Sequence, residues 1–425
     1  MDSLRLDSPP ETSAQAETVA VRSLENVWLW SCLAIGSLLR VIWPLDIEWK
    51  LDEKWMFQKA VNIAHGVEPW PLLGMQNGIG TENPGAAVWM FAALAHLADT
   101  PVGMTQLVCV SNVIAIWGFA AWVMKTWPEA DRRLGLGGVA LFAVSPIPVL
   151  FSRKIWAQDV LPLLLVPVLF GHSLRHRPWA AFMWGVMSAF NAQIHLSGFF
   201  ATGALMLATF IFDRARTRWL PMILGGVVGC IPMLPWVAYL FTPEASRNPR
   251  PVRWSLIYFW DAFKTAFGLD LRYPLRKEFS QFLRGPSIAG VDTWLIAAAH
   301  IALLLLALAS AVVVVRSFRK ITLSQHLKIY ATTLLFTGLM FHALRVRLFV
   351  HYLIILSPLL HIGAAWMLSQ RRHWLAACCA LQLFLSASFL WYIHANGGAP
   401  RGDFGITYRA QTPEQRTSDM NGPPK

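Results

Sequence analysis

The sequence has few charged residues and few cysteines for its length. Only 14% of its 425 residues are Asp, Glu, Lys or Arg, whereas soluble proteins average about 25%. The five cysteines all lie in apolar runs and match neither a disulfide framework nor a metal site. The sequence also lacks the glycine-rich lysine loop of nucleotide-binding proteins and the HExxH motif of zinc proteases. These absences exclude an ordinary soluble enzyme and a soluble nucleotide-binding domain.

The sequence contains long apolar segments instead. Hydrophobic residues make up 55% of the chain, and its mean hydropathy is +0.45. A helix needs about 20 apolar residues to cross a membrane, and continuous runs exclude a membrane barrel, whose strands alternate. We predict an all-α, polytopic membrane protein with eleven spanning helices, near 26–45, 103–124, 134–151, 157–173, 178–194, 196–212, 220–240, 291–315, 327–345, 349–369 and 373–393.

Basic residues indicate the topology of these spans. Five clusters fit the cytoplasmic side under the positive-inside rule if the N-terminus is cytoplasmic and the stretch 85–98 lies along the membrane without crossing it. Residues 1–25 form a polar tail that lacks the features of a signal peptide, so the first helix is expected to remain as an anchor. The clusters are Lys125 with Arg132 and Arg133, Arg175 with Arg177, Arg214 with Arg216 and Arg218, Arg316 with Arg319 and Lys320, and Arg371 with Arg372.

This topology divides the chain into parts with different expected roles. The irregular loops fall on the outer face, which favours chemistry on that side. Transport with alternating access more often shows paired halves with broken helices, and no internal repeat is evident. The expected parts are a cytoplasmic tail (1–25), a membrane module (26–240) with a first outer loop (46–84), a basic outer loop (241–290), C-terminal spans (291–393) and an outer polar tail (394–425).

The most informative residues are Asp52 and Glu53, in the first outer loop. If residues 47–65 are helical, both carboxylates lie one turn before Met56 and Phe57, on the face of an apolar stripe. A buried negative charge is costly unless it is paired or used. We therefore interpret the pair as working carboxylates; the alternative is a solvated loop that starts a surface helix. The same helical reading places the polar residues on the opposite face, namely Lys50, Lys54, Gln58 and Asn62.

The outer face also carries basic residues where the topology disfavours them. Arg345 and Arg347 lie at the outer end of one helix and Arg153 at another, while many more occupy the loop 241–290. Arginine binds phosphate through a planar fork of donors. These residues therefore predict a site for a lipid-linked phosphate, although contact with ordinary anionic lipid head groups would explain the long loop equally well.

Further polar residues interrupt the apolar segments on the outer face. Glu82 precedes the short stretch 85–98, and Asp159 lies in the loop after Arg153. Gln193 and His195 interrupt what is otherwise one long apolar stretch, and a histidine in such a turn is more often structural than catalytic. We consider all four as candidates for orienting a substrate.

These residues, in this order, resemble those of the GT-C membrane glycosyltransferases. The resemblance is to the protein O-mannosyltransferases and lipid A aminoarabinose transferases, and it covers roughly residues 26–240. Leu51-Asp52-Glu53 with Ala60, Glu82-Asn83-Pro84, and Asp159 after Ser152-Arg153 carry it. The sequence departs from the family near position 84, where Asn-Pro-Gly stands in place of Lys-Pro-Pro, and no soluble C-terminal domain follows.

The resemblance implies a sugar donor on a polyprenyl phosphate and a base in the first outer loop. Asp52 would accept the proton of an acceptor hydroxyl, with Glu53 beside it, and Arg345, Arg347 and Arg153 would stabilise the departing lipid phosphate. No cofactor is required, because a glycosyl phosphate has a good leaving group; a divalent metal, if used, would involve Asp52 and Glu82.

The expected partners are the donor, a lipid, glycan or protein acceptor, and membrane lipids, with no nucleic acid. The expected location is the bacterial inner membrane. The main alternative function is transport of a lipid-linked sugar or another anionic lipid across the membrane. A non-catalytic subunit that recruits a partner enzyme, and transfer of a phosphate-containing group, also remain open.

Overall fold

The fold is described from a computed structural model of the chain. It describes residues 12–76, 81–245, 256–317, 319, 322–346, 348–371 and 373–418, and only the backbone of residues 12–26. The first helix already begins at Thr12, within the region expected to be a polar tail. Arg347, Arg372 and part of the basic outer loop, residues 246–255, lie outside the described residues.

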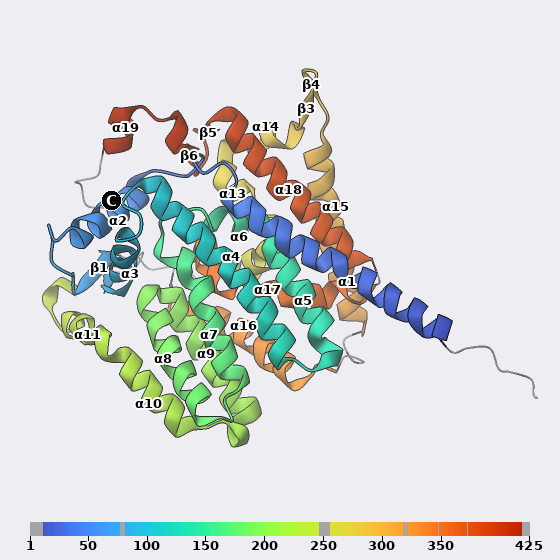
Figure 1. Cartoon of the computed structure of the whole chain (residues 1–425), viewed down its shortest axis with the longest axis horizontal. Helices are drawn as coiled ribbons and strands as arrows, with labels where there is room; N and C mark the ends of the chain where they lie inside the picture. The colour runs from blue at the N-terminus through green and yellow to red at the C-terminus, as the bar shows by residue number, and fades with distance from the viewer. Residues whose placement is uncertain are drawn as a thin grey trace, which may run out of the picture.

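The N-terminal half consists of helices joined by short turns, with one small hairpin near its start (Figure 1). The antiparallel strands β1 and β2 pair Leu73 with Pro84 and Gln76 with Glu82. The elements are α1 (Thr12–Val41), α2 (Leu51–Ala64), β1 (Leu73–Gln76), β2 (Glu82–Pro84), α3 (Ala86–Ala95), α4 (Pro101–Thr126), α5 (Glu129–Val144), α6 (Pro146–Phe151), η1 (Ala157–Val160), α7 (Leu161–Ser173), α8 (Pro178–Ile194), α9 (Leu196–Asp213), η2 (Arg214–Arg216), α10 (Trp219–Cys230), η3 (Ile231–Met233), α11 (Leu234–Leu240) and η4 (Pro243–Ala245).

The C-terminal half adds long helices and two more two-stranded antiparallel hairpins, β3–β4 and β5–β6. Its elements are α12 (Ile257–Ala266), α13 (Arg272–Leu275), η5 (Arg276–Glu278), α14 (Phe279–Arg284), β3 (Ser287–Ile288), β4 (Val291–Asp292), α15 (Leu295–Ser317), α16 (Gln325–Ala343), η7 (Val350–Leu356), α17 (Ser357–Leu368), α18 (Trp374–Asn396), β5 (Gly398–Ala399), β6 (Gly405–Ile406), η8 (Tyr408–Ala410) and α19 (Pro413–Thr417).

The chain is an all-α, multi-pass membrane protein, as predicted, but the expected number of eleven spans is not confirmed. Among the described residues, six helices are long and apolar enough to cross a membrane, and three further apolar helices are shorter. Several expected spans are divided where a proline begins a new helical segment, as at Pro146 between α5 and α6. Proline lacks the backbone N–H that would donate to the carbonyl four residues earlier. Its ring also disfavours helical backbone angles at the residue before it.

The stretch 85–98 contains only the ten-residue helix α3. At 1.5 Å per residue this helix is about 15 Å long, roughly half of the hydrocarbon thickness of a bilayer. It packs against α2, which agrees with a stretch that lies along the membrane.

Small residues let the central helices approach closely, as is common in membranes. A Cβ atom added to Gly36 of α1 would lie 2.4 Å from the carbonyl oxygen of Ala143 in α5. One added to Gly138 of α5 would lie 2.5 Å from the Ile362 side chain in α17. The glycines at these two positions thus serve helix packing.

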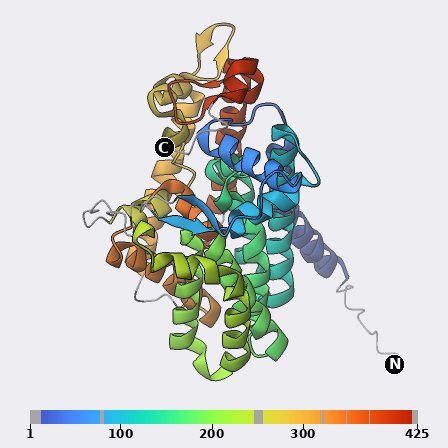
Figure 2. The same ribbon diagram turned by 90° about the vertical axis from the view of Figure 1, so that its left-hand side faces the viewer.

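The two ends of the molecule differ in character (Figure 2). The end with α2 also holds the β3–β4 hairpin and the C-terminal elements, and α8 to α10 run away from it. The opposite end joins the basic connectors: the Arg175 guanidinium pairs with Asp213, and His326 contacts Asp131 at 3.3 Å. These connectors therefore lie at the opposite end of the fold from α2.

Candidate functional site

Helix α2 carries Asp52 and Glu53 in its first turn, where the helix dipole favours negative charge. Glu53 is fully buried, whereas Asp52 keeps part of its surface exposed. Lys54 was expected on the polar face but is 4% exposed, because its ammonium donates to the Ser418 carbonyl at 3.0 Å near the end of the chain. The predicted apolar stripe of α2 is buried at Met56, Phe57, Ala60 and Ile63.

Three buried carboxylates surround the ammonium of Lys154, which lies between α6 and η1. Lys154 makes an ion pair with Glu48 and interacts electrostatically with Glu53 and Asp159. Lys50, at the start of α2, pairs with Glu48 as well. Among the described residues, the carboxylate oxygens of Glu53 and Asp159 accept no hydrogen bond. The structure thus brings three predicted residues, Asp52, Glu53 and Asp159, together with Lys50, Lys154 and Glu48, to which the sequence analysis gave no role in the site.

Burial and mutual repulsion shift the proton affinity of these acids. Burial and, second, the nearby Glu48 charge raise the pKa of Glu53 to about 8, although the two lysines act to lower it. Burial also raises the pKa of Asp52, which Lys50 partly offsets. Burial lowers the pKa of Lys154, but Glu48 and Glu53 outweigh this effect and hold it above its ordinary value. Asp52 is therefore the partly exposed acid of this group, and its pKa is raised.

Arg153 performs a different task from its neighbour Lys154. Its guanidinium donates to the carbonyls of Leu39, Arg40, Ile42 and Trp43 at 3.2, 3.1, 2.7 and 3.0 Å. These carbonyls belong to the end of α1, where a helix leaves acceptors without partners. Because its donors are taken up and its surface is 4% exposed, we do not carry Arg153 forward as a phosphate ligand; this geometry replaces the predicted role.

A row of aromatic rings leads from Lys154 towards α9. The Lys154 ammonium lies 4.6 Å from the Trp156 ring centre, and the Trp156 ring lies 5.2 Å from that of His351 in η7. The His351 ring is 6.1 Å from that of His195, whose Nδ1 accepts from the Ser197 backbone N–H at 3.2 Å and caps α9. His195 thus lies near the carboxylate cluster while it has a clear structural task.

Gln193 has a structural task within the membrane part of the fold. Its amide donates to the carbonyl of Gly229 in α10 at 2.7 Å and to that of Ala189 at 3.0 Å, and the side chain is fully buried. These bonds tie α8 to α10. Gln193 therefore supports the packing of these helices and is less suited to bind a substrate.

Glu82 lies in the β1–β2 hairpin and is attached to α11. Its carbonyl accepts from the Trp236 ring N–H at 2.8 Å, and its backbone N–H contacts the Tyr239 hydroxyl at 3.5 Å. Arg345 lies in an exposed turn after α16 with a positive φ of 52°. Both remain candidates for the site.

An apolar cavity of about 530 Å³ lies between the hairpin and helices α8 to α11. Its wall is formed mainly by apolar and small side chains, including Trp184, Phe199, Met206 and Trp236. It also includes Leu196, the residue next to His195. The cavity thus starts near the end of the aromatic row and extends between membrane helices.

The end of the chain completes the site. Residues 397–418, which we term the C-terminal strap, fold back onto the start of α2, and Thr407 forms a β-bridge with Glu48. In Figure 1 the strap elements β5, β6 and α19 lie beside α2. The sequence analysis expected only a polar outer tail here. Its Gly- and Pro-rich ends carry no periodic pattern that indicates this docking.

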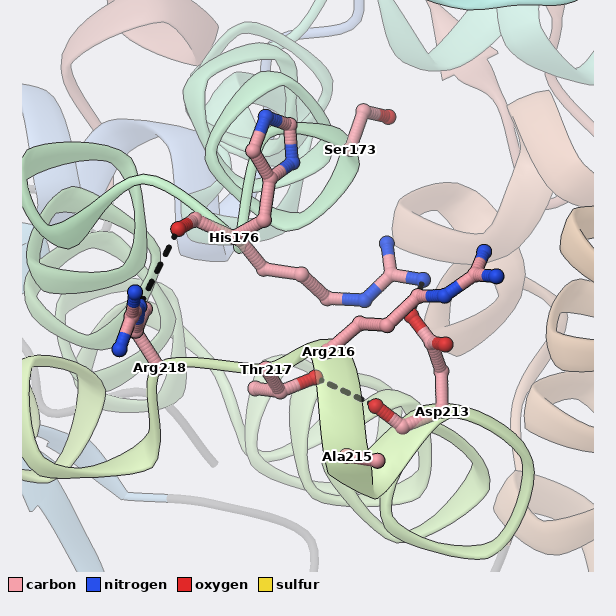
Figure 3. Close-up of a pocket in the computed structure, with 8 residues that line it drawn as sticks. Ser173, His176, Asp213, Ala215, Arg216, Thr217 and Arg218 are labelled. Carbon is pink, nitrogen blue, oxygen red and sulfur yellow. Dashed lines mark hydrogen bonds and ion pairs between the residues drawn. The ribbon is translucent and has the colours of Figure 1, made fainter.

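A second cavity, which is polar and has a volume of about 490 Å³, lies at the opposite end of the fold (Figure 3). It is lined by Arg175, Asp213, Arg216 and Arg218 among others. Arg175 is paired with Asp213, and the Arg218 side chain donates to the His176 carbonyl at 3.4 Å. The positive-inside rule already accounts for basic residues at these loops, so we do not assign this cavity to the reaction.

No metal site is apparent in the part of the chain that the structure describes. There, no group of three or more His, Cys, Asp or Glu side chains has positions suited to a metal ion. The space between Glu48, Glu53 and Asp159 is taken by the Lys154 ammonium. The suggested metal ligands Asp52 and Glu82 therefore do not form part of such a group.

No protein-family model and no curated protein matches the sequence. Solved structures do match its fold. ArnT from Cupriavidus metallidurans in the apo state aligns with a TM-score of 0.52 at 14% identity, over 89% of this chain and 64% of that chain. Its complex with undecaprenyl phosphate gives 0.52 and 14%, over 88% and 64%. The oligosaccharyltransferase of Archaeoglobus fulgidus in the apo form gives 0.47 and 16%, over 93% and 60%.

This chain therefore spans less than two thirds of the length of the ArnT chain it matches. The likeness concerns the arrangement of the helices. The chain has the GT-C fold that its sequence resemblance predicted.

Proposed function

We propose that this protein is a membrane glycosyltransferase that moves a sugar from a polyprenyl-phosphate donor to an acceptor on the outer, periplasmic face of the bacterial inner membrane. The N-terminus would be cytoplasmic. The observation that carries the proposal is Asp52, a half-exposed acid with a raised pKa beside two lysines, at the outer end of a GT-C fold.

The donor class is supported by two features at the site. Lys50 and Lys154 supply positive charge beside Asp52, as a departing lipid phosphate requires. The apolar cavity between α8 and α11 offers a place for an isoprenoid chain next to the aromatic row. The matching ArnT structure with undecaprenyl phosphate agrees with a lipid phosphate as ligand.

The proposed reaction is a direct displacement at the anomeric carbon of the sugar. The acceptor hydroxyl oxygen forms the new bond to this carbon while Asp52 accepts its proton. The bond from the carbon to the phosphate oxygen breaks, and the electron pair leaves with the lipid phosphate. Lys50, which is 35% exposed, meets the negative charge that builds on this oxygen. Lys154 is buried and paired with Glu48, so it acts on this charge only through its electric field. Glu53 and Asp159 hold Lys154 beside the reacting groups.

The remaining predicted residues are proposed to contact the donor. Arg345 is proposed to meet the phosphate at the outer rim, and Glu82 with His195 to contact the donor near the apolar cavity. The acceptor is a lipid, a glycan or a protein.

The test is sugar transfer by the purified protein in lipid nanodiscs, with a panel of radiolabelled polyprenyl-phosphate sugars and candidate acceptors. Asp52→Asn is compared with wild type, and Asp99→Asn serves as a control because Asp99 is an exposed carboxylate before α4. We expect turnover by wild type and the control, and a loss of about 10²-fold or more in Asp52→Asn, typical of a removed general base.

Equal turnover by Asp52→Asn and wild type would refute Asp52 as the base. Movement of the labelled lipid across the bilayer without any sugar transfer would refute the transferase and support a transporter. Binding of the donor by folded Asp52→Asn, checked by filtration, separates a lost base from a lost binding site.

A further inference from the structure

The C-terminal strap is fixed to the polypeptide just before α2 by bonds from both sides. The Tyr408 N–H donates to the Ile47 carbonyl at 3.0 Å, and the Trp49 ring N–H donates to the Arg416 carbonyl at 2.9 Å. The amide of Gln411 adds a bond to the Trp49 carbonyl at 2.8 Å. The strap therefore has a defined register over residues 47–54.

This register places one acidic side chain, Asp403, at the turn of the β5–β6 hairpin against Lys50. The Asp403 carboxylate lies 3.6 Å from the Lys50 ammonium and 2.6 Å from the Arg276 guanidinium. The Lys50 ammonium also donates to the Asp403 carbonyl oxygen. The turn itself is held because the Phe404 N–H donates to the Pro274 carbonyl at 3.0 Å.

Lys50 is consequently held from two sides, by Glu48 and by Asp403. A lysine side chain is flexible, and fixing it costs rotamer entropy. Lys50 is also 35% exposed, so without these partners its ammonium would move through solvent. With them, the ammonium is already in place beside Asp52, which senses its charge.

We propose that Asp403 is a positioning residue of the site, which holds the Lys50 ammonium next to Asp52 for the phosphate of the substrate. The proposal rests on the function proposed above. It makes the C-terminal strap a working part of the site, although the strap lies more than 300 residues from α2 in the sequence. Preorganised charge of this kind needs no rearrangement when the leaving group develops its own charge.

The first experiment does not depend on catalysis. Lys50 labelling by a water-soluble amine reagent is followed by mass spectrometry in nanodiscs, for wild type, Asp403→Asn and Asp403→Glu. We expect Asp403→Asn to label several-fold faster, since the ammonium loses one of its two carboxylate partners, and Asp403→Glu to restore slow labelling. Glu414→Gln is the matched control, because Glu414 is an exposed acid on the same strap. An unchanged Lys50 labelling rate in Asp403→Asn would overturn the proposal.

The second experiment measures the binding of undecaprenyl phosphate and the pH profile of transfer. Asp403→Asn should weaken binding of the lipid phosphate by about tenfold, the effect of losing one well-placed charged contact. The Lys50 charge lowers the pKa of Asp52 more than the Asp403 charge raises it. The acid limb of kcat/KM should therefore move to higher pH in Asp403→Asn, in which Lys50 leaves its place, and return in Asp403→Glu.

The outcomes separate the positioning role from the proposed function. Loss of activity in Asp403→Asn without a shift of the acid limb, and with wild-type lipid phosphate binding, would indicate a merely structural strap and overturn the proposal. Wild type that binds undecaprenyl phosphate but transfers no sugar would refute the transferase alone. In that case the labelling and binding results for Asp403→Asn still decide the positioning role.

Discussion

Replacement of the buried Glu53 by glutamine should stabilise the protein at pH 8 and remove much of the pH dependence of its stability. Glu53 is fully enclosed, and its carboxylate oxygens accept no hydrogen bond among the described residues. A buried, unsatisfied carboxylate favours its neutral form. Glutamine has nearly the same shape and carries no charge at any pH, so the variant isolates the cost of ionisation.

The expected magnitude follows from the shifted pKa. Burial, with Glu48 as the next cause, raises the pKa of Glu53 from 4.5 to about 8. Between these two pH values Glu53 keeps its proton in the folded protein but releases it in the unfolded chain. The contribution of the neutral Glu53 side chain to the free energy of unfolding is therefore fully present below pH 4.5 and is lost as the pH rises to 8. The difference of 3.5 units between the two values corresponds to at most about 5 kcal/mol at about 1.4 kcal/mol per unit. Water entry and side-chain relaxation reduce this to a few kcal/mol.

The assay is thermal unfolding in nanodiscs at a fixed scan rate, followed by fluorescence of the 21 tryptophans from pH 5 to pH 9. The apparent Tm of wild type should fall across this range by several degrees more than that of Glu53→Gln. Glu68→Gln is the control, because Lys59 lowers the pKa of Glu68 in a partly exposed pair outside this cluster. Parallel curves for wild type and Glu53→Gln would refute the reasoning.

Two further predictions concern the lysine and the arginine between α6 and η1. Lys154→Gln should destabilise the fold by about 3–5 kcal/mol at pH 8, since it leaves the buried Glu48 carboxylate without one of its partners; a loss below 1 kcal/mol in chemical unfolding would contradict a buried ion pair. Arg153→Leu should lower the apparent Tm and expose the end of α1 to hydrogen exchange, because four carbonyls lose their donor. Unchanged exchange at residues 39–43 would argue against the capping role, and wild-type binding of undecaprenyl phosphate by this variant would agree with its removal from the phosphate site.

Local sequence patterns predicted the burial of a side chain correctly where that burial depends only on the side chain's own helix. The three-and-four spacing after Asp52 predicted the buried face of α2 correctly, because the period of a helix determines which residues share a side. The apolar composition of the chain was sufficient to predict that it is an all-α membrane protein. The same local reading was wrong for Lys54, which is buried by a segment far along the chain.

The sequence predicted the boundaries of the membrane helices only in part. Hydropathy located the apolar segments, but it does not report where a proline divides a segment into two helices, as at Pro146. Hydropathy also cannot separate a crossing helix from the ten-residue α3 packed on α2. Length along the axis depends on the backbone conformation, which the apolar character of the residues does not specify.

The sequence by itself determined that this is a membrane protein with acidic residues at one end, because hydropathy and charge act residue by residue. Only the tertiary structure decided which charges meet. Arg153 and Lys154 are neighbours in sequence, yet one caps α1 and the other pairs with Glu48. Asp403 reaches Lys50 only because the strap folds back over α2. Contacts between distant segments depend on how the helices pack together, and no local pattern in either segment encodes that arrangement.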